Sequence, residues 1–283
     1  MKRTKSFDNT HPVLYLISTP IGNLSEFNSR ALDIVSQMDI IAAEDTRNSG
    51  QLINHFGMKK EMFSLREHNE KEASERLIKL IKEGKKVAYM SDAGYPGISD
   101  PGYLLVKAAI ENDIAVSVIN GASAFISALV ASGLPTDHFY FYGFLPAKEN
   151  EAKTILVEMK NRQETIIFYE APHRIEKTIH LLQEVFGNRE VVIARELTKI
   201  NEEYIRGHLD ELINIDFSTL KGEMVVILQG NDKEQEIDEK QIEERLKFFL
   251  DKGLSKKDAI EIVSEEYKIN KNLIYKLAVS QKS

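Results

Sequence analysis

Short apolar runs alternate with helical periodicity through the first half of the chain. The runs are rich in β-branched and other apolar side chains, which is typical of strands buried in a sheet. Strands are expected at 13–18, 40–43, 86–90 and 115–119. Helices are expected between them, at 29–37, 46–56, 70–83, 101–112 and 122–132. Because strands and helices alternate, the pattern predicts a parallel sheet covered by helices.

The second half of the chain has a different pattern. Strands are expected at 139–142, 165–169, 190–196, 204–208 and 223–228. Only two long helices, at 149–159 and 174–186, interrupt this series. The later strands follow one another with little between them, so a mixed sheet is predicted.

A polar segment separates this part from the C-terminal residues. Residues 231–236 are uniformly polar or charged, as expected of a linker or a solvated helix start. Three short helices are expected beyond it, at 242–250, 256–267 and 271–278, and Ser255 with Asp258 forms a predicted N-terminal cap. The sequence thus predicts an α/β fold with two domains, 1–120 and 121–231, followed by a helical, helix-turn-helix-like tail at 232–283.

Composition narrows the class of protein. With 42% hydrophobic and 29% charged residues among 283, the chain is typical of a soluble globular protein. No apolar run approaches the roughly 20 residues that span a bilayer, and the N-terminal residues contain no apolar signal core, so a cytoplasmic protein without membrane contact is expected. The absence of cysteine excludes disulfides, thiolate nucleophiles and cysteine zinc sites. The seven histidines lack metal-binding spacing, so no metal is expected.

Polar and turn-forming residues follow the predicted strands, where ligands bind in parallel sheets. These exits lie at 19–23, 44–47, 91–102, 120–124, 169–174 and 195–199. They contain neither the G-x-G-x-x-G dinucleotide pattern nor a phosphate-binding loop. Their glycines let backbone groups approach a small ligand that has an amino-acid end and an adenosine end. Glycine and proline also simply form turns, but several such exits together favour a binding site.

Ten short motifs occur along the chain in an order that resembles one family. They lie at 14–24, 42–47, 68–70, 91–94, 98–102, 132–135, 143–146, 169–174, 195–199 and 221–223. Together they resemble the tetrapyrrole methylase superfamily, and within it the branch that methylates ribosomal RNA. Two positions depart from the pattern. Tyr95 stands where threonine is usual, and Asn120 replaces the proline that normally precedes Gly121.

The resemblance implies a homodimer that binds S-adenosyl-L-methionine in the cleft between its two α/β domains. It also implies the reaction, which is 2′-O-methylation of a cytidine ribose in the decoding centre of 16S ribosomal RNA, with the small ribosomal subunit as partner. By position in the motifs, the implied cofactor contacts are Pro20, Gly94, Tyr95, Ile98, Ser123, Ala124, Tyr169, Ala171, Leu197, Glu223 and Met224.

Charged residues in the same motifs are candidates for catalysis. A ribose hydroxyl is a poor nucleophile, so groups that orient or deprotonate it would assist the transfer. The candidates are Glu44, Asp45, Arg47, Glu170, Glu196 and Lys199. The alternative is that these side chains form ion pairs that only stabilise loops.

The net charge of −7 argues against indiscriminate nucleic-acid binding, so RNA recognition requires a local basic face. The tail offers one, because no acidic residue follows Glu266. RNA contacts are expected from His173, Arg174, Arg195, Lys268, Lys271 and Lys276. In the alternative reading, the tail is a pair of amphipathic helices that only stabilises the dimer.

Two rival functions stay open at this level. A methyltransferase for a small tetrapyrrole intermediate would share the fold and the cofactor, but the basic tail and residues 170–174 favour RNA. A non-catalytic RNA-binding or assembly protein would keep the fold and lose the cofactor. The polar strand exits speak against that loss.

Overall fold

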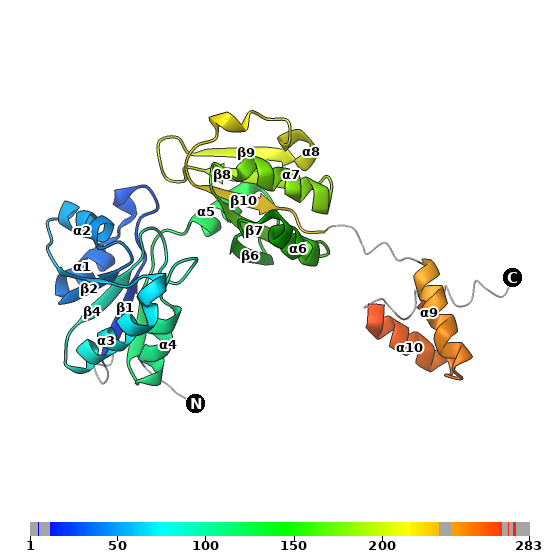
Figure 1. The fold of residues 1–283 in the computed structure, drawn as a ribbon, viewed down its shortest axis with the longest axis horizontal. Coiled ribbons are helices and arrows are strands. Elements are labelled where there is room, and N and C mark those ends of the chain that lie inside the picture. The colour runs from blue at the N-terminus through cyan, green and yellow to red at the C-terminus, as the bar shows by residue number, and fades with distance from the viewer. Residues whose placement is uncertain (1–4, 6–11, 232–238, 268–270, 272–273, 276–283) are drawn as a thin grey trace. The chain divides into compact units, whose positions relative to one another are not determined.

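Five parallel strands form the first sheet of the computed structural model, which describes Lys5 and residues 12–231, 239–267, 271 and 274–275. The strands are β1 (Val13–Ile17), β2 (Ile40–Ala43), β3 (Glu61–Ser64), β4 (Val87–Met90) and β5 (Ala115–Ile119). Their order across the sheet is β3-β2-β4-β1-β5 (Figure 1). All neighbouring pairs are parallel, which confirms the prediction from the alternating pattern.

Helices cover both faces of this sheet, because alternate side chains of a strand point to opposite faces. They are α1 (Ser29–Gln37), α2 (Thr46–His55), α3 (Glu70–Lys82) and α4 (Tyr103–Glu111). In β4, Val87 and Tyr89 belong to the core that includes α3 and α4. Ala88 and Met90 belong to the core that includes α1 and α2. The apolar run of β4 therefore contributes to two cores, as a strand buried on both faces must.

The sequence pattern does not predict β3. Its residues, Glu-Met-Phe-Ser, include no β-branched side chain, so the usual strand signal is missing. The strand forms by parallel pairing with β2 at the edge of the sheet, where Glu61 lies opposite Ile40. It is exposed or only partly buried along its length, so it needs no continuous apolar run.

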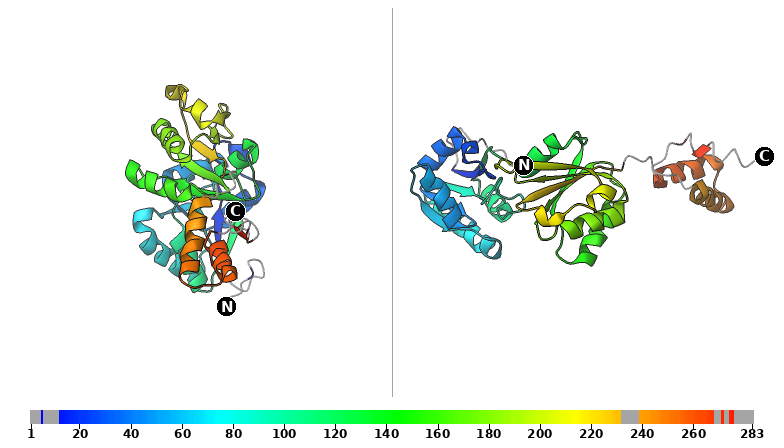
Figure 2. Two further views of the ribbon diagram at one scale, coloured as in Figure 1. Left: turned by 90° about the vertical axis from the view of Figure 1, so that its right-hand side faces the viewer. Right: turned by 90° about the horizontal axis from the view of Figure 1, so that it is seen from above.

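The second sheet is mixed, as predicted. Its strands are β6 (Phe139–Phe144), β7 (Thr165–Glu170), β8 (Glu190–Arg195), β9 (Glu203–His208) and β10 (Met224–Leu228), in the order β6-β7-β10-β8-β9. Only β6 and β7 run parallel, and the other three pairs are antiparallel. The last strand in sequence is thus the central one, between β7 and β8 (Figure 2).

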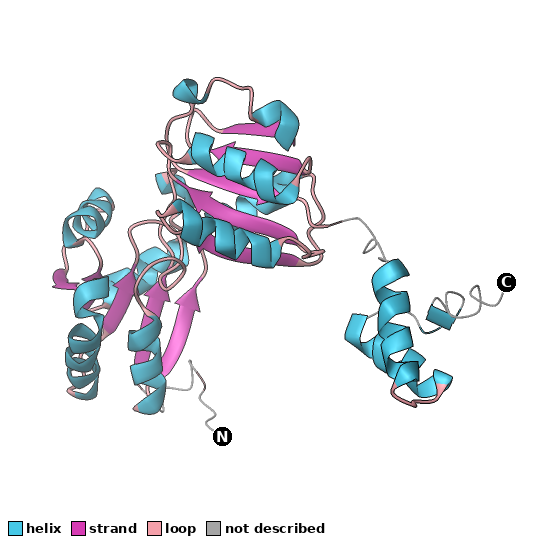
Figure 3. Cartoon of the chain, turned by 45° about the vertical axis from the view of Figure 1, so that its right-hand side comes forward, coloured by secondary structure: helices cyan, strands magenta, loops and turns pink. Residues whose placement is uncertain are grey.

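Helices again cover the second sheet (Figure 3). They are α5 (Ala124–Ser132), α6 (Glu149–Met159), α7 (Ile175–Phe186) and the short α8 (Leu209–Leu212). Val226 of β10 shares a core with α6, α7 and α8, whereas Val225 and Ile227 share one with α5. Three 3₁₀ turns lie in the connecting loops, namely η1 (Leu24–Glu26), η2 (Glu67–Asn69) and η3 (Phe217–Thr219).

Residues 1–230 and 231–283 are two compact units. In the second unit, α9 (Glu239–Asp251) and α10 (Lys256–Tyr267) share a small core that includes Ile242 and Val263. The predicted cap forms, because the Asp258 amide donates to the Ser255 hydroxyl at 3.2 Å. Most of the third predicted helix, 271–278, lies outside the described residues. In the described part of the chain, no helix is both long and apolar enough to cross a membrane.

Candidate functional site

Hydrogen bonds tie together the residues that follow β1, β4 and β5. Thr19 and Gly94 form an antiparallel bridge with N···O distances of 2.9 and 3.1 Å. The Ser18 hydroxyl donates to the carbonyl of Ala122 at 2.9 Å, which joins the exit of β1 to the exit of β5. Gly94 has a φ of 77°, a backbone conformation that suits glycine. The carboxyl ends of these three strands therefore form one connected rim.

Both positions that depart from the family pattern belong to this rim. The Tyr95 hydroxyl accepts a hydrogen bond from the Gly121 amide at 3.2 Å. The Asn120 carbonyl accepts one from the side-chain amide of Asn28 at 2.6 Å. Tyr95 therefore links the loop after β4 to the residues after β5.

Side chains of Tyr89 and Glu70 hold the rest of the loop after β4 through hydrogen bonds. The fully buried Tyr89 donates its hydroxyl proton to the carbonyl of Pro101 at 2.9 Å. A carboxylate oxygen of Glu70 accepts from the Gly102 amide at 2.8 Å. These contacts fix the backbone on the C-terminal side of Asp100.

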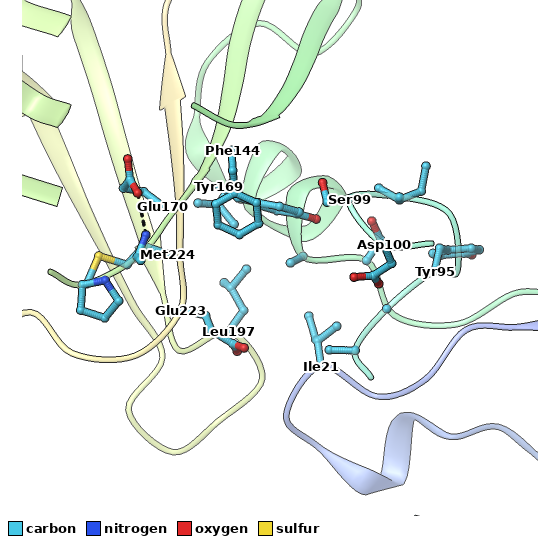
Figure 4. Close-up of a pocket in the computed structure, with 18 residues that line it drawn as sticks. Ile21, Tyr95, Ser99, Asp100, Phe144, Tyr169, Glu170, Leu197, Glu223 and Met224 are labelled. Atoms are coloured by element: carbon cyan, nitrogen blue, oxygen red, sulfur yellow. Dashed lines mark hydrogen bonds between the residues drawn. The ribbon is translucent and has the colours of Figure 1, made fainter. Parts of the chain in front are cut away.

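A cavity of about 290 Å³ lies where the exits of both sheets meet (Figure 4). Ten of the eleven expected cofactor contacts line it, namely Gly94, Tyr95, Ile98, Ser123, Ala124, Tyr169, Ala171, Leu197, Glu223 and Met224. Pro20 does not line it, but its neighbour Ile21 does. The strand exits thus meet around one space, although they are scattered over more than two hundred residues of sequence.

Aromatic and aliphatic side chains form part of the wall. Ile21 and Leu197 are buried, and they belong to the same apolar cluster as Tyr169. The ring of Phe144 contacts that of Tyr169, with 5.4 Å between centroids, yet Phe144 is 53% exposed. Phe144 therefore offers an aromatic surface both to the cavity and to solvent.

Among the residues that line the cavity, Asp100 has a strongly raised pKa. Burial, reinforced by the carboxylates of Glu44 and Asp92, raises the pKa of Asp100 to about 7. Burial and Asp92 also raise the pKa of Glu44. Glu44 does not line the cavity itself. Asp100 is not among the candidates from the sequence, although it lies within the motif at 98–102. The signal that could have identified it is an acidic residue inside a long strand exit.

Asp45 and Arg47 form a pair outside the cavity lining. Asp45 is the N-cap of α2 and accepts from the Arg47 amide at 2.9 Å. The Arg47 guanidinium also donates to its carboxylate, and these hydrogen bonds hold the pKa of Asp45 well below its usual range. The local role of Asp45 is therefore to begin the helix, as a capping carboxylate does.

Glu170 and Arg174 form a second pair, at the end of β7. The side chain of Glu170 is fully buried, 3.3 Å from the Arg174 guanidinium, and its carboxylate accepts from the hydroxyl of Thr178. Arg174 also donates to the carbonyls of Leu145 and Pro146, at 2.8 and 3.1 Å. Glu170 lines the cavity, but its charge is already compensated.

Lys199 joins two carboxylates, Glu196 and Glu223, of which Glu223 lines the cavity. Its ammonium group lies 2.9 Å from Glu196 and 3.3 Å from Glu223, and the hydrogen bond that it donates to Glu196 is the main reason that the pKa of Lys199 is raised. Glu196 and Thr198 both have positive φ values, 50° and 66°. Two such residues in one loop indicate local strain that the surroundings maintain, a feature frequent at functional sites.

Comparison with known proteins connects this geometry to a family. Residues 13–213 match the family described as Tetrapyrrole (Corrin/Porphyrin) Methylases. A relative from Halalkalibacterium halodurans, named ribosomal RNA small subunit methyltransferase I, is 43% identical over 93% of both chains. Relatives of the same name from Bacillus subtilis and Escherichia coli O157:H7 are 38% and 41% identical, over 97% and 99% of both chains. The chain belongs to the tetrapyrrole methylase family, among its ribosomal RNA small subunit methyltransferase I members.

Solved structures support the tetrapyrrole methylase fold. The methyltransferase CobJ matches with a TM-score of 0.58 and 16% identity, covering 78% of this chain and 95% of its own. Uroporphyrin-III-C-methyltransferase from Thermus thermophilus matches with a TM-score of 0.53 and 18% identity, covering 77% and 94%. At these identities the likeness concerns the fold alone.

Of the four described residues that were expected to contact RNA, three form local contacts. Arg174 and Arg195 are partly buried, and Arg195 pairs with Glu203 across the β8–β9 edge. His173 is exposed beside the cavity residue Pro172. Lys271 pairs with Glu261 in the tail. The remaining two, Lys268 and Lys276, lie outside the described residues.

Proposed function

We propose that this protein transfers a methyl group from S-adenosyl-L-methionine to the 2′-hydroxyl of a cytidine ribose in the decoding centre of 16S ribosomal RNA. The observation that carries the proposal is the cavity, which collects motif residues from both halves of the chain. Relatives named ribosomal RNA small subunit methyltransferase I, similar over almost the whole chain, support the RNA substrate.

The cavity residues fit S-adenosyl-L-methionine. Its lining contains carboxylates but no lysine, arginine or histidine, which suits a ligand with a cationic sulfonium. Apolar side chains such as Leu197 and Val225 suit the adenosine part. The volume of about 290 Å³ is close to the lower end of the range for ligand pockets, roughly 300 Å³. When bound, the cofactor supplies the methyl group in electrophilic form.

The chain's own contribution is to place the ribose hydroxyl, accept its proton and exclude water. Backbone groups at the rim, around Gly94 and Ser123, would hold the amino-acid and adenosine ends of the cofactor. Phe144 offers a surface on which an unpaired base can stack, as RNA-binding proteins often use aromatic side chains. We place the reaction in the cytoplasm and assign it to a homodimer acting on the small ribosomal subunit, with contacts from His173 and the tail.

Transfer of labelled methyl from S-adenosyl-L-methionine tests this function. Three acceptors are compared: small ribosomal subunits that lack the modification, naked 16S RNA, and a tetrapyrrole intermediate such as uroporphyrinogen III. Label in the RNA of the subunits supports the proposal. Label in the tetrapyrrole alone would assign the protein to the small-molecule branch, and failure to bind the cofactor in calorimetry would favour a non-catalytic RNA-binding protein.

A further inference from the structure

Asp100 is a carboxylate that faces the cavity without a partner. It lines the cavity, and its side chain makes no hydrogen bond or ion pair with any residue in the described part of the chain. Of the other candidate carboxylates, Asp45, Glu170 and Glu196 each pair with a cationic side chain, and Glu44 does not line the cavity. Asp100 is therefore available to a ligand, whereas those three are engaged in local structure.

The backbone around Asp100 is held in an unusual conformation. Ser99 has a φ of 60°, which is uncommon for a residue with a side chain. Its hydroxyl oxygen would lie 3.1 Å from a Cβ added at Gly143, so the loop packs directly against β6. Pro101, on the other side, is anchored by Tyr89. A strained backbone that its neighbours fix is a common way to position a functional group.

The ionisable groups around Asp100 are acids. Those that face it are the carboxylates of Glu44 and Asp92 and the phenols of Tyr89 and Tyr169. Glu170 and Glu223 line the same cavity, but they are paired with Arg174 and Lys199. Because burial and the carboxylates of Glu44 and Asp92 disfavour its charged form, Asp100 binds a proton more readily than an ordinary carboxylate does. Figure 4 shows Tyr169 extending from β7 toward the loop that carries Ser99 and Asp100.

We propose that Asp100 is the general base that removes the proton from the ribose 2′-hydroxyl. This inference rests on the proposed function. As the bond from oxygen to the methyl carbon forms, the hydroxyl proton passes to a carboxylate oxygen of Asp100. The electron pair of the breaking carbon–sulfur bond stays with the departing thioether, so charge and atoms balance. A base whose proton affinity matches neutral pH is the most effective kind, and the elevated pKa of Asp100 meets that condition.

Asp100→Asn keeps the shape of the side chain and removes its basicity. We expect single-turnover methyl transfer to small ribosomal subunits to slow by about 100-fold or more, the usual contribution of a general base. In the wild type the rate should rise with pH through the region near 7, and in the variant this rise should be absent. Asp33→Asn is the matched control, because Asp33 is an exposed aspartate on α1 outside the cavity.

Binding measurements separate a base from a cofactor ligand. A carboxylate that only holds the positive charge of the cofactor would lower the affinity for S-adenosyl-L-methionine when replaced, and leave that for the neutral S-adenosylhomocysteine unchanged. We expect the variant to bind both within about threefold of the wild type. A loss of affinity for S-adenosyl-L-methionine as large as the loss of rate would overturn the proposal, and so would a variant rate within threefold of the wild type.

Proton release gives a readout that does not depend on catalysis. Binding of a cation beside Asp100 favours the ionised carboxylate, so the wild type should release a fraction of a proton per cofactor bound at pH 7. Calorimetry in buffers with different ionisation enthalpies measures this number, and it should fall close to zero in Asp100→Asn. Equal release from both proteins would overturn the proposal. If wild-type enzyme labels no RNA at all, the proposed function fails, and the role of Asp100 as base fails with it.

Discussion

Between pH 3.8 and about pH 7, Asp100 keeps its proton in the folded protein and releases it in the unfolded chain. The pKa of Asp100 is raised from 3.8 to about 7, so stability decreases as the pH rises between these values. We expect Asp100→Asn to unfold at a higher temperature than the wild type at pH 8, and the difference to vanish toward pH 4. Thermal denaturation followed by circular dichroism checks this. Equal unfolding midpoints of the two proteins at pH 8 would show that the surroundings of Asp100 do not raise its pKa.

Sequence spacing explains why other carboxylates were easier to recognise than Asp100. Asp45, Glu170 and Glu196 stand out in charged motifs, and each has its cationic partner two to four residues further on. The same spacing makes the ion-pair alternative visible in the sequence. The raised pKa that distinguishes Asp100 depends on its burial in the folded protein, and then on Glu44, which lies on another strand exit and meets it only in the folded sheet.

At the scale of single elements, the loop after β8 packs against the exit of β1. A Cβ at Gly22 would lie 2.6 Å from Cγ of Lys199 and 3.0 Å from the carbonyl oxygen of Leu197. Gly22→Ala should therefore displace this loop, and with it Leu197 in the cavity wall, and weaken cofactor binding by about tenfold, or roughly 1.4 kcal/mol. Calorimetry with S-adenosyl-L-methionine measures the loss.

Gly50→Ala is the control for that substitution. Gly50 lies inside α2, and a Cβ there meets nothing within 4 Å. The change should leave cofactor affinity unaltered and stabilise the protein by roughly 0.5–1 kcal/mol, because alanine is the better helix former. If Gly22→Ala bound cofactor as tightly as Gly50→Ala does, the loop after β8 would have no part in shaping the cavity.

Elements with strong periodicity were predictable, and those that depend on tertiary contacts were not. The apolar run of β4 indicates a strand buried on both faces, and the cores confirm it. Strand β3 forms through pairing with β2 rather than through its own residues. The positive φ values of Glu196 and Thr198 had no sequence signal, because glycine, the usual residue there, is absent.

At the scale of the whole molecule, the tail at 231–283 has a hydrophobic core of its own, so its removal leaves the cores of residues 1–230 intact. We expect a chain that ends at Gly230 to bind S-adenosyl-L-methionine as the full chain does. Its affinity for small ribosomal subunits should fall by about tenfold and depend less on salt, because fewer phosphate contacts release fewer counterions. Filter binding across a salt series checks both effects. Unchanged affinity and salt slope would mean that the tail has another role, such as stabilising a dimer.

The central claim is that the cavity at the strand exits directs a methyl group to a ribose oxygen of ribosomal RNA. The most direct test is to incubate unmodified small subunits with the wild-type protein and labelled S-adenosyl-L-methionine, and to digest the RNA to nucleosides. The account predicts label in 2′-O-methylcytidine, from a cytidine of the decoding centre. Label in a base-methylated nucleoside, or in no nucleoside although the cofactor binds, would contradict it.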